Sequence, residues 1–349
     1  MKRLPFFLFF IIRFGQAQDK GTVQIDTLVS SSLANTLTKE DSKRPLAIYL
    51  PPGYFTSAKR YPVLYLLHGI GDDHLDFVDD TSKYYTIQYL MDSGIASHRF
   101  GEMIIVTPNE KTNWFGSFYT NSSATGNWED FTATELVNYM DTKYRTIARP
   151  ESRAIAGHSM GGYGAIRIAM KHPDIFSVVY SMNGAFICFE GENSSDSPDI
   201  KKFVLAKTYD ELLATHRKNT MGMLTVAQAF SPNPANPPFY ADKPFKMDGD
   251  KVVPDFLAYN KWLENDVVNM AEKYKNNLLK LRGIMFDAGD QDEWKFIVIN
   301  NRLFSKKLTS LRIHYKFEEY QGDHRNKIWG LNGRIYNDVL PFVFDLMEK

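Results

Sequence analysis

A glycine-flanked turn around Ser159 is the feature of this sequence that points most clearly to chemistry. Ser159 lies in Gly157-His158-Ser159-Met160-Gly161-Gly162, which has the G-x-S-x-G pattern of a nucleophile elbow. In such an elbow a strand turns into a helix within a few residues, and glycine is needed two positions before and after the serine because side chains there would clash. An apolar run at 154–156 precedes the turn, and an amphipathic pattern at 161–171 follows it. The spacing predicts Ser159 as a nucleophile at a helix N-terminus, whose free N–H groups point at the reaction centre.

A serine hydroxyl is a weak nucleophile, so Ser159 needs a base. Of the eight histidines in the chain, four precede Ser159, whereas in strand–turn–helix sites of this type the acid and then the histidine follow the serine. Three later histidines are expected at a helix end, in an insertion and inside a strand, namely His172, His216 and His314. His324 instead follows the last expected strand. Because active sites of open α/β sheets lie at the carboxyl ends of the strands, we predict His324 as the base.

An acidic residue that orients the histidine is expected after the preceding strand. The stretch from Asp287 to Glu293 offers four carboxylates. Asp287 is too close to the strand interior. Spacing alone leaves Asp290 and Asp292 as equal candidates for the acid, and Glu293 is a weaker candidate.

The oxyanion formed by attack on a carbonyl group needs two backbone N–H donors. The residue after the nucleophile, Met160, supplies one in sites of this type. The other is expected from the loop after the pair His68-Gly69, and we predict Ile70. His68 itself is expected to brace this loop rather than to take a proton.

Aromatic residues near the expected site are candidates for a substrate pocket. Several follow the strand that ends at Pro108, and of these Trp114 and Tyr119 are predicted to contact substrate, with packing within the loop as the equal alternative. Trp294 lies next to the candidate acids and is predicted to form a wall of the cleft.

Metal and cofactor sites are not expected. The stretch Gly71-Asp72-Asp73-His74 contains possible ligands, but no further residues at ligand spacing accompany it. The single cysteine, Cys188, allows neither an intramolecular disulfide nor a cysteine cluster for zinc, and it is expected to be a buried structural thiol.

Strand and helix patterns alternate along the chain, which predicts an α/β fold with a doubly wound, mostly parallel sheet. Continuous apolar runs, typical of strands that are buried on both faces, stand before the motifs described above. The expected strands are 46–50, 62–67, 103–106, 154–156, 178–181, 283–287 and 313–317, and the expected helices include 132–144, 161–171 and 333–347.

One long segment, at about 185–277, interrupts this alternation. It has no clear strand, a proline-rich loop at 231–239 and a helical pattern at 259–273. Long insertions between core strands are usually functional, and we expect this one to form a cap over the site. The polar segment at 18–44 is expected to be an extended lead-in to one α/β domain at 45–349.

The first 17 residues have the pattern of a signal peptide. Lys2 and Arg3 precede a short apolar run, and Gly15-Gln16-Ala17 provides small residues for cleavage. We therefore expect an exported protein, periplasmic or secreted. The apolar run is too short to span a bilayer, and no later segment is predicted to do so.

The composition is ordinary for a globular protein, with 44% hydrophobic and 23% charged residues. Lysine plus arginine and aspartate plus glutamate both number 41, so the net charge is zero. This balance gives no indication of nucleic acid as a partner, and nothing in the sequence specifies an oligomeric state.

Taken together, these motifs resemble the esterase D and feruloyl esterase family of α/β-hydrolases, a group that also includes the mycolyltransferases. The resemblance runs from about Arg44 to Lys349 and is weakest in the insertion. Its pieces are Tyr61 to Gly69, Ser117-Phe118-Tyr119, Asn127 to Phe131 with Glu135-Leu136, Gly157 to Gly164, the Gly289-x-x-Asp292 loop and Gly322-Asp323-His324. It implies an α/β-hydrolase fold with a cap-like insertion. It also implies that the acid is the aspartate of the G-x-x-D loop, Asp292, and that His324 is the histidine of the triad.

The expected function is hydrolysis of carboxylic esters through an acyl-enzyme on Ser159, without a cofactor. The resemblance implies short acyl esters, or feruloyl and acetyl esters that include those of polysaccharides. One alternative is an acyltransferase similar to the mycolyltransferases, which would move the acyl group to a sugar or alcohol. Another is a thioesterase similar to S-formylglutathione hydrolases, against which the export signal argues. A binding protein without catalysis is disfavoured by the complete set of Ser159, Asp292 and His324.

Overall fold

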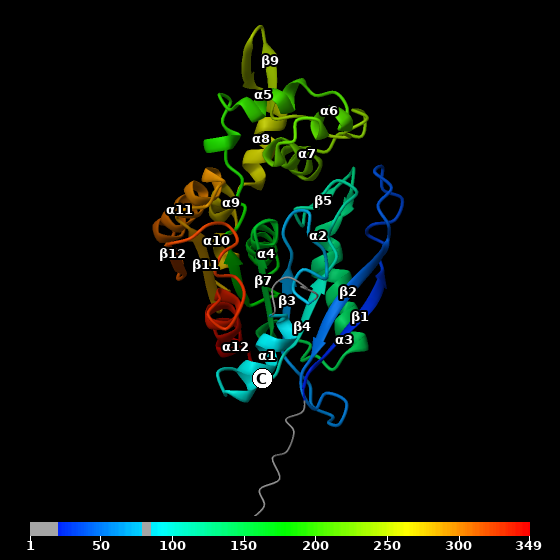
Figure 1. Ribbon diagram of the computed structural model, residues 1–349, viewed down its shortest axis with the longest axis vertical. Helices are drawn as coiled ribbons and strands as arrows, with labels where there is room; N and C mark the ends of the chain where they lie inside the picture. The colour runs from blue at the N-terminus through cyan, green and yellow to red at the C-terminus, as the bar shows by residue number, and fades with distance from the viewer. Residues whose placement is uncertain (1–19, 79–84) are drawn as a thin grey trace, which may run out of the picture.

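The computed structural model describes residues 20–78 and 85–349, and an eight-stranded sheet lies at the centre of this part of the chain (Figure 1). The strand order is β1-β2-β4-β3-β7-β8-β11-β12. The strands are β1 (Thr22–Val29), β2 (Lys43–Leu50), β3 (Val63–Leu67), β4 (Ile104–Pro108), β7 (Arg153–His158), β8 (Val178–Met182), β11 (Gly283–Gly289) and β12 (Lys316–Tyr320). β2 is antiparallel to both β1 and β4, and the pairings from β4 to β12 are all parallel. The predicted doubly wound, mostly parallel sheet is confirmed.

The central strands are buried on both faces of the sheet, which explains their unbroken apolar sequences. In β3, Val63, Tyr65 and Leu67 belong to one hydrophobic cluster, whereas Leu64 and Leu66 belong to the other. This division follows from the two-residue period of a strand, which places neighbouring side chains on opposite faces.

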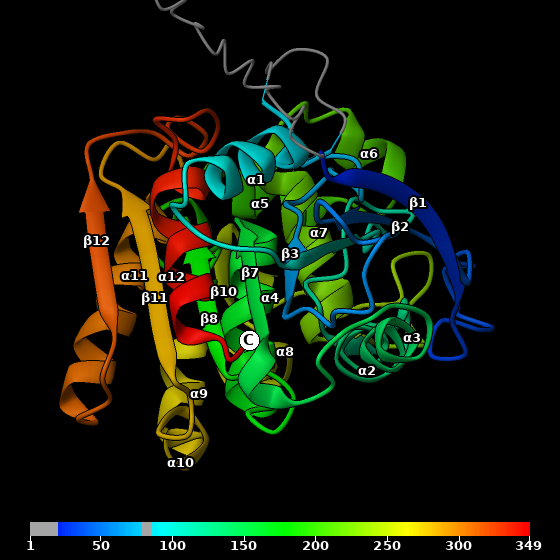
Figure 2. The ribbon, with the colours of Figure 1, turned by 90° about the horizontal axis from the view of Figure 1, so that it is seen from below.

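Helices cover both faces of the sheet. The side chains of α1 (Ile87–Ala96), the π-helical η4 (Ile335–Val339) and α12 (Leu340–Leu346) pack on the face of Leu64 and Leu66. The opposite face is covered by α3 (Leu136–Lys143), α4 (Met160–Lys171) and α11 (Lys295–Ser310). Figure 2 shows α12 in front of β8 and β11, with β1 and β12 at opposite ends of the sheet. Short elements connect these layers: β5 (Asn121–Ser122), β6 (Gly126–Asn127), α2 (Trp128–Asp130), the π-helical η1 (Phe131–Glu135) and the 3-10 helix η2 (Pro150–Ser152).

The described part of the segment predicted as an extended lead-in at 18–44 contributes β1 and the first residues of β2 to the sheet. Its β1 pairs with β2 over its whole length, from Thr22 opposite Leu50 to Val29 opposite Lys43. The sheet therefore begins before residue 45, where the domain was predicted to start. The strand is hard to recognise in the sequence because its apolar residues, Val23, Ile25, Leu28 and Val29, do not alternate regularly with polar ones.

The insertion between β8 and β11 is mostly helical, but it also contains a hairpin that the sequence did not predict. The two strands of this hairpin, β9 (Phe245–Asp248) and β10 (Lys251–Pro254), have only four residues each, which is too short for a clear strand pattern. Figure 1 shows the first part of the insertion gathered beyond one edge of the sheet, where the cap was expected. Its helices are η3 (Gly191–Asn193), α5 (Pro198–Leu205), α6 (Tyr209–Leu213), α7 (Lys218–Phe230) and α8 (Phe256–Asn265).

The last part of the insertion packs beside the sheet instead of over its edge. α9 (Val267–Lys273) contacts α4 and α11, and α10 (Lys275–Leu278) contacts α4. The helical pattern predicted at 259–273 is divided at Asp266, whose carboxylate accepts a hydrogen bond from the N–H of Val268 and caps α9. The cap is thus shorter than the insertion.

Residues 1–17, predicted as a signal peptide, lie outside the described part of the chain. In the part that is described, every helix is too short or too polar to cross a lipid bilayer.

Candidate active site

Ser159 lies between the end of β7 and the start of α4, in a backbone conformation that few residues adopt. Its φ and ψ are 57° and −117°, so the chain reverses sharply at this residue, at an energetic cost typical of functional sites. The main chain holds the turn, because the N–H of Ser159 donates to the carbonyl of Met182 at 2.9 Å and its carbonyl accepts from the N–H of Ala185 at 2.9 Å. The elbow predicted from the glycine spacing is present.

The two glycines of the elbow are required by close backbone packing. A Cβ atom on Gly157 would overlap the backbone of Gly161, and one on Gly161 would overlap the carbonyl of Leu67 in β3. The sheet and the helix therefore approach each other only because neither residue has a side chain.

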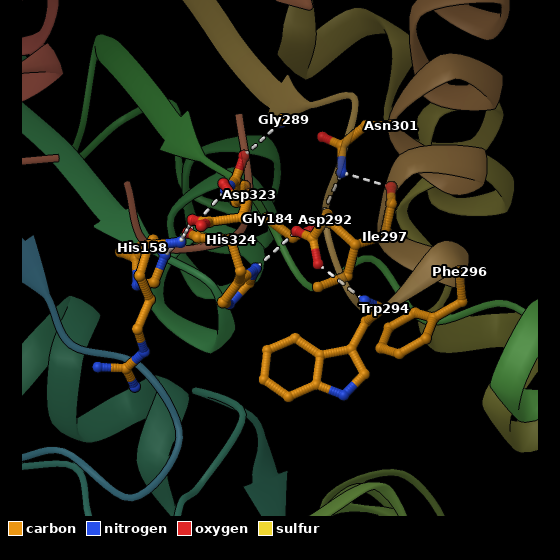
Figure 3. Close-up of polar contacts among 12 residues, drawn as sticks. His158, Gly184, Gly289, Asp292, Trp294, Phe296, Ile297, Asn301, Asp323 and His324 are labelled. Atoms are coloured by element: carbon orange, nitrogen blue, oxygen red, sulfur yellow. Dashed lines mark hydrogen bonds and ion pairs between the residues drawn. The ribbon is translucent and has the colours of Figure 1, made fainter. Parts of the chain in front are cut away.

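A buried hydrogen bond joins Asp292 and His324. The Nδ1 atom of His324 donates to Oδ2 of Asp292 at 2.6 Å (Figure 3). The exposed fraction is 1% for His324 and 0% for Asp292. The other carboxylate oxygen accepts from the N–H of Trp294 at 2.9 Å. Asp292 follows β11 and His324 follows the neighbouring parallel strand β12, which brings both side chains to the carboxyl edge of the sheet. With Nδ1 donating to the carboxylate, Nε2 is free to accept a proton.

The structure separates the two aspartates that spacing left equal. Asp290 is exposed, and its Oδ1 accepts from the N–H of Gly322 at 3.0 Å, so it shapes the turn between the two loops. Asp287 is buried in an ion pair with Arg334 and also accepts from the hydroxyl of Tyr180. Of the candidate acids, Asp292 is the residue placed against His324.

Three side chains fix the position of His324. Its carbonyl oxygen accepts hydrogen bonds from Nδ2 of Asn183 at 2.7 Å and from Nε2 of His158 at 2.9 Å. The indole of Trp294 meets the imidazole edge-on, at 4.6 Å between ring centres (Figure 3). Burial holds the pKa of His158 well below its usual value, which keeps this ring neutral. Asn183 was not predicted, although it follows β8 at the same sheet edge as the candidate acid and base.

Met160 and Ile70, predicted to supply the oxyanion donors, both line one cavity together with Ser159. Met160 is the first residue of α4, so its N–H has no intrahelical acceptor. The loop that carries Ile70 is held in place, because the N–H of Gly71 donates to the carbonyl of Phe115 at 2.9 Å.

His68 braces this loop from behind. Its Nε2 accepts from the N–H of Glu110 at 2.9 Å, which leaves Nδ1 to donate to the carbonyl of Gly69 at 2.8 Å. Complete burial lowers the pKa of His68 to about 4, so its ring is neutral near pH 7. These contacts agree with a bracing function and leave neither nitrogen free to serve as a base.

Two of the three aromatic residues predicted to contact substrate do not line the cavity. Tyr119 is fully buried, and its hydroxyl donates to the carbonyl of His68 at 2.9 Å. Its ring fills the space beside α4 that a glycine, Gly164, leaves open. Trp114 donates from Nε1 to the carbonyl of Met221 at 3.0 Å and so supports α7. Both residues thus pack their loop against other elements, Trp114 against α7 and Tyr119 against α4 and His68. Trp294 does line the cavity.

The cavity beside Ser159 measures about 400 Å³ and is mostly apolar. The insertion supplies much of its wall, including Met221, Met223 and Val226 of α7 and Asn193 of η3. None of these belongs to a motif of ester hydrolysis, and only their position in the predicted cap connected them with the site. The exposed side chains of Lys218 and Arg325 also line the cavity.

Within the described residues, no group of three or more histidine, cysteine, aspartate or glutamate side chains is arranged to hold a metal ion. The thiol of Cys188 contacts the carbonyl of Phe296 at 3.7 Å, and burial raises its pKa to about 12. Such a thiol is not a reactive nucleophile near pH 7.

Comparison with known proteins gives a consistent result. A family model described as "Putative esterase" matches residues 38–332. The esterase Rv1288 of Mycobacterium tuberculosis is 34% identical over 139 residues, which are 39% of this chain and 28% of that protein. The diacylglycerol acyltransferase/mycolyltransferase Ag85A of Mycobacterium leprae is 28% identical over 130 residues, 35% of this chain and 36% of the relative. These matches therefore cover well under half of either relative.

A solved structure of a ferulic acid esterase superposes with a TM-score of 0.65 and 26% identity, covering 94% of this chain and 100% of that one.

Proposed function

Since the chain belongs to the esterase family and has the α/β-hydrolase fold, we propose that it hydrolyses carboxylic esters through an acyl-enzyme formed on Ser159. The observation that carries this proposal is the buried Asp292–His324 pair at the sheet edge on which the strained Ser159 elbow opens into a cavity. The family match accounts for the reaction class, and the arrangement of these three residues accounts for its mechanism.

In the first step, the Ser159 hydroxyl attacks the ester carbonyl while Nε2 of His324 takes its proton. The Asp292 carboxylate holds the imidazole in the correct tautomer and stabilises the charge that it gains. His324 then donates the proton to the leaving alcohol, which departs and leaves the acyl group on Ser159. In the second step, His324 removes a proton from water as the water attacks the acyl-enzyme. It then returns this proton to the Ser159 oxygen as the acid is released.

Charge develops on the carbonyl oxygen in both steps. The N–H groups of Ile70 and Met160 are the proposed donors to this oxyanion. The bracing of the loop by His68 would keep the first donor in place without any rearrangement during the reaction. Such preorganised donors stabilise the transition state more than water does, because they need not reorient as the charge forms.

The substrate class proposed is an ester with a short acyl or aromatic acyl group, including feruloyl and acetyl esters of polysaccharides. The mostly apolar cavity, with Trp294, Phe115 and Phe118 in its wall, suits an apolar group of this size. The similarity to a ferulic acid esterase supports the aromatic members of this class.

Acyl transfer is a second candidate, favoured by the similarity to a mycolyltransferase. The chemistry on Ser159 would be the same, but a sugar or other alcohol would replace water in the second step. Analysis of the products in the presence of added glucose or trehalose separates the two: a sugar ester indicates transfer, and free acid alone indicates hydrolysis.

The test of the proposed function is hydrolysis of p-nitrophenyl acetate and methyl ferulate by the full chain. Ser159→Ala should abolish turnover of both esters and also labelling by a fluorophosphonate. Ser177→Ala is the matched control, because it removes a hydroxyl that is equally buried but lies before β8, away from the cavity. Turnover that survives in Ser159→Ala, or absence of both turnover and labelling in the wild type, would contradict the proposal.

Export of the protein is also proposed, from the pattern of the first 17 residues. N-terminal sequencing of the protein isolated from its source should find a chain that starts at Gln18. A chain that retains Lys2 and Arg3 would contradict this.

A further inference from the structure

Asn193 is a polar residue in the site that the mechanism above does not use. It lines the cavity that contains Ser159, and its exposed fraction is 0%. Among the described residues, neither Oδ1 nor Nδ2 of its side chain has a hydrogen-bond partner. Asn193-Ser194-Ser195 also matches the acceptor sequence for N-glycosylation, but an amide buried in this way is out of reach for a glycosyltransferase in the folded protein.

The position of Asn193 is fixed by its backbone. Its N–H donates to the carbonyl of Glu190 at 3.1 Å, and the carbonyl of the preceding Glu192 accepts from Nδ2 of Asn219 in α7 at 3.2 Å. On the other side, Gly191 packs against the first residues of α11, Lys295 and Phe296. The residue is therefore held between the two helices that supply the cavity wall, and its unpaired amide is not the result of a loose surface loop.

A buried amide without a partner destabilises a folded protein, because it has lost its hydrogen bonds to water. Folded proteins leave few such groups, and those that occur call for an explanation. The amide of Asn193 offers one acceptor and two donors. Met223, Phe296 and Ile297 of the same cavity wall are apolar and offer no partner, and Asn219, which also lines it, donates from Nδ2 to the carbonyl of Glu192.

We infer that Asn193 is a specificity-determining residue that hydrogen-bonds a hydroxyl group on the part of the ester bound in the cavity. A hydroxyl both donates and accepts, so it can satisfy the acceptor and one donor of the amide together. The preferred substrates are accordingly esters with an apolar acyl or alcohol group that carries a hydroxyl away from the ester bond. This inference rests on the proposed esterase function and goes beyond it, since the triad and the oxyanion donors do not distinguish such esters from their analogues without the hydroxyl.

The enzyme should discriminate strongly between two esters that differ only by this hydroxyl group. An analogue that lacks the hydroxyl leaves the amide unpaired in an apolar surrounding, which costs more than the loss of a hydrogen bond in water. We expect kcat/KM to differ by about fivefold or more between the members of a matched pair of substrates.

Two pairs of esters test this on the full chain. Methyl 3-(4-hydroxyphenyl)propionate and methyl 3-phenylpropionate differ by a hydroxyl on the acyl side, and 4-hydroxyphenyl acetate and phenyl acetate differ by one on the alcohol side. The ratio of kcat/KM is measured in each pair for the wild type and for Asn193→Leu, which replaces the amide by an apolar group of similar size. Met223→Leu is the matched control, because it changes the shape of the same cavity without removing a polar group.

The expected result is a preference for the hydroxylated ester in at least one pair, lost in Asn193→Leu and kept in Met223→Leu. Asn193→Leu should also melt at the same temperature as the wild type or higher, since it removes an unpaired buried amide. Asn193→Ala gives the same comparison of ratios if the leucine variant does not fold.

Equal rates or no turnover in both pairs, in a wild type that hydrolyses p-nitrophenyl acetate, would overturn the inference and leave the esterase proposal intact. A preference that persists in the Asn193 variants would also overturn it. A lower melting temperature of Asn193→Leu with an unchanged ratio would show that the amide is paired through internal water and serves stability instead. Failure of the esterase proposal itself is recognised separately, by a wild type that neither hydrolyses p-nitrophenyl acetate nor reacts with a fluorophosphonate.

Discussion

His158, the residue directly before the elbow serine, donates a hydrogen bond from Nε2 to the carbonyl oxygen of His324 at 2.9 Å. The two rings are also in contact, at 4.7 Å between their centres. This bond connects the β7–α4 turn, which carries Ser159, to the loop after β12, which carries the proposed base. The relative position of nucleophile and base therefore depends on a side chain that takes no part in the proposed proton transfers.

His158→Ala should lower kcat by about 10- to 100-fold with little change in KM, because a small displacement of the base impairs proton transfer more than substrate binding. His158→Gln should recover part of the loss, since its amide nitrogen can reach the same carbonyl. Steady-state kinetics with p-nitrophenyl acetate checks both variants. A KM that rises while kcat is unchanged would contradict this positioning role.

Asp292→Asn should lower kcat by about 10³- to 10⁴-fold, because an amide no longer favours the tautomer of His324 that accepts a proton at Nε2. Asp290→Asn is the control from the same loop and should keep kcat within about threefold of the wild type, since Asp290 is exposed and contacts Gly322. The measurement is kcat for p-nitrophenyl acetate. A large loss of kcat in Asp290→Asn together with a nearly unchanged kcat in Asp292→Asn would show that the acid is wrongly assigned.

Tyr119 and Trp294 should respond differently to substitution, although both were predicted to contact substrate. Tyr119→Phe leaves the His68 carbonyl without the Tyr119 hydroxyl, so it should lower the free energy of unfolding by about 1–2 kcal/mol and leave the KM for aryl esters unchanged. Trp294→Ala removes part of the cavity wall and should raise that KM by about tenfold. Urea unfolding and steady-state kinetics on both variants provide the comparison, and a raised KM in Tyr119→Phe would show that the tyrosine does reach the substrate.

Stability should fall in acid partly because His68 is buried as a neutral ring. Its pKa is about 4 in the folded protein and about 6.5 when unfolded, so the unfolded chain takes up a proton first as the pH falls. The contribution is fully present above pH 6.5 and is lost between pH 6.5 and 4, to a total of about 3 kcal/mol. The buried His158, whose pKa is also lowered, acts in the same direction.

Urea unfolding at pH 7.5, 5.5 and 4 should therefore show a smaller loss of stability in His68→Gln, whose side chain stays neutral throughout. The exposed His314 provides the control, and His314→Gln should follow the wild type. An identical loss in all three proteins would exclude His68 as a source of the pH dependence.

Local features of the sequence were sufficient for much of the fold and for two of the three proposed catalytic residues. The parallel strands were predicted because residues buried on both faces leave unbroken apolar runs. β1 and the β9–β10 hairpin were not, because the apolar residues of β1 do not alternate regularly and each strand of the hairpin has only four residues. The insertion was recognised only as a break in the alternation, and its contribution to the cavity wall came from packing between α7, η3 and α11.

What the sequence determined by itself is the chemistry encoded within a few consecutive residues. Ser159 is identified by Gly157 and Gly161, because the strained turn excludes side chains at those two positions. The order of the chain then leaves His324 as the histidine at the correct sheet edge. The first inference depends on the short-range geometry of the turn, and the second depends on the order of the expected strands along the chain.

Only the tertiary structure decided which side chains meet. Asp290 and Asp292 stand two residues apart in one loop, and the turn made with the loop after β12 directs the first to Gly322 and the second to His324. In the same way, the Tyr119 ring occupies the space beside Gly164, and its hydroxyl bonds to His68 instead of facing the cavity. In each case the direction of the side chain is set by elements distant in sequence, and spacing along the chain carries no information about them.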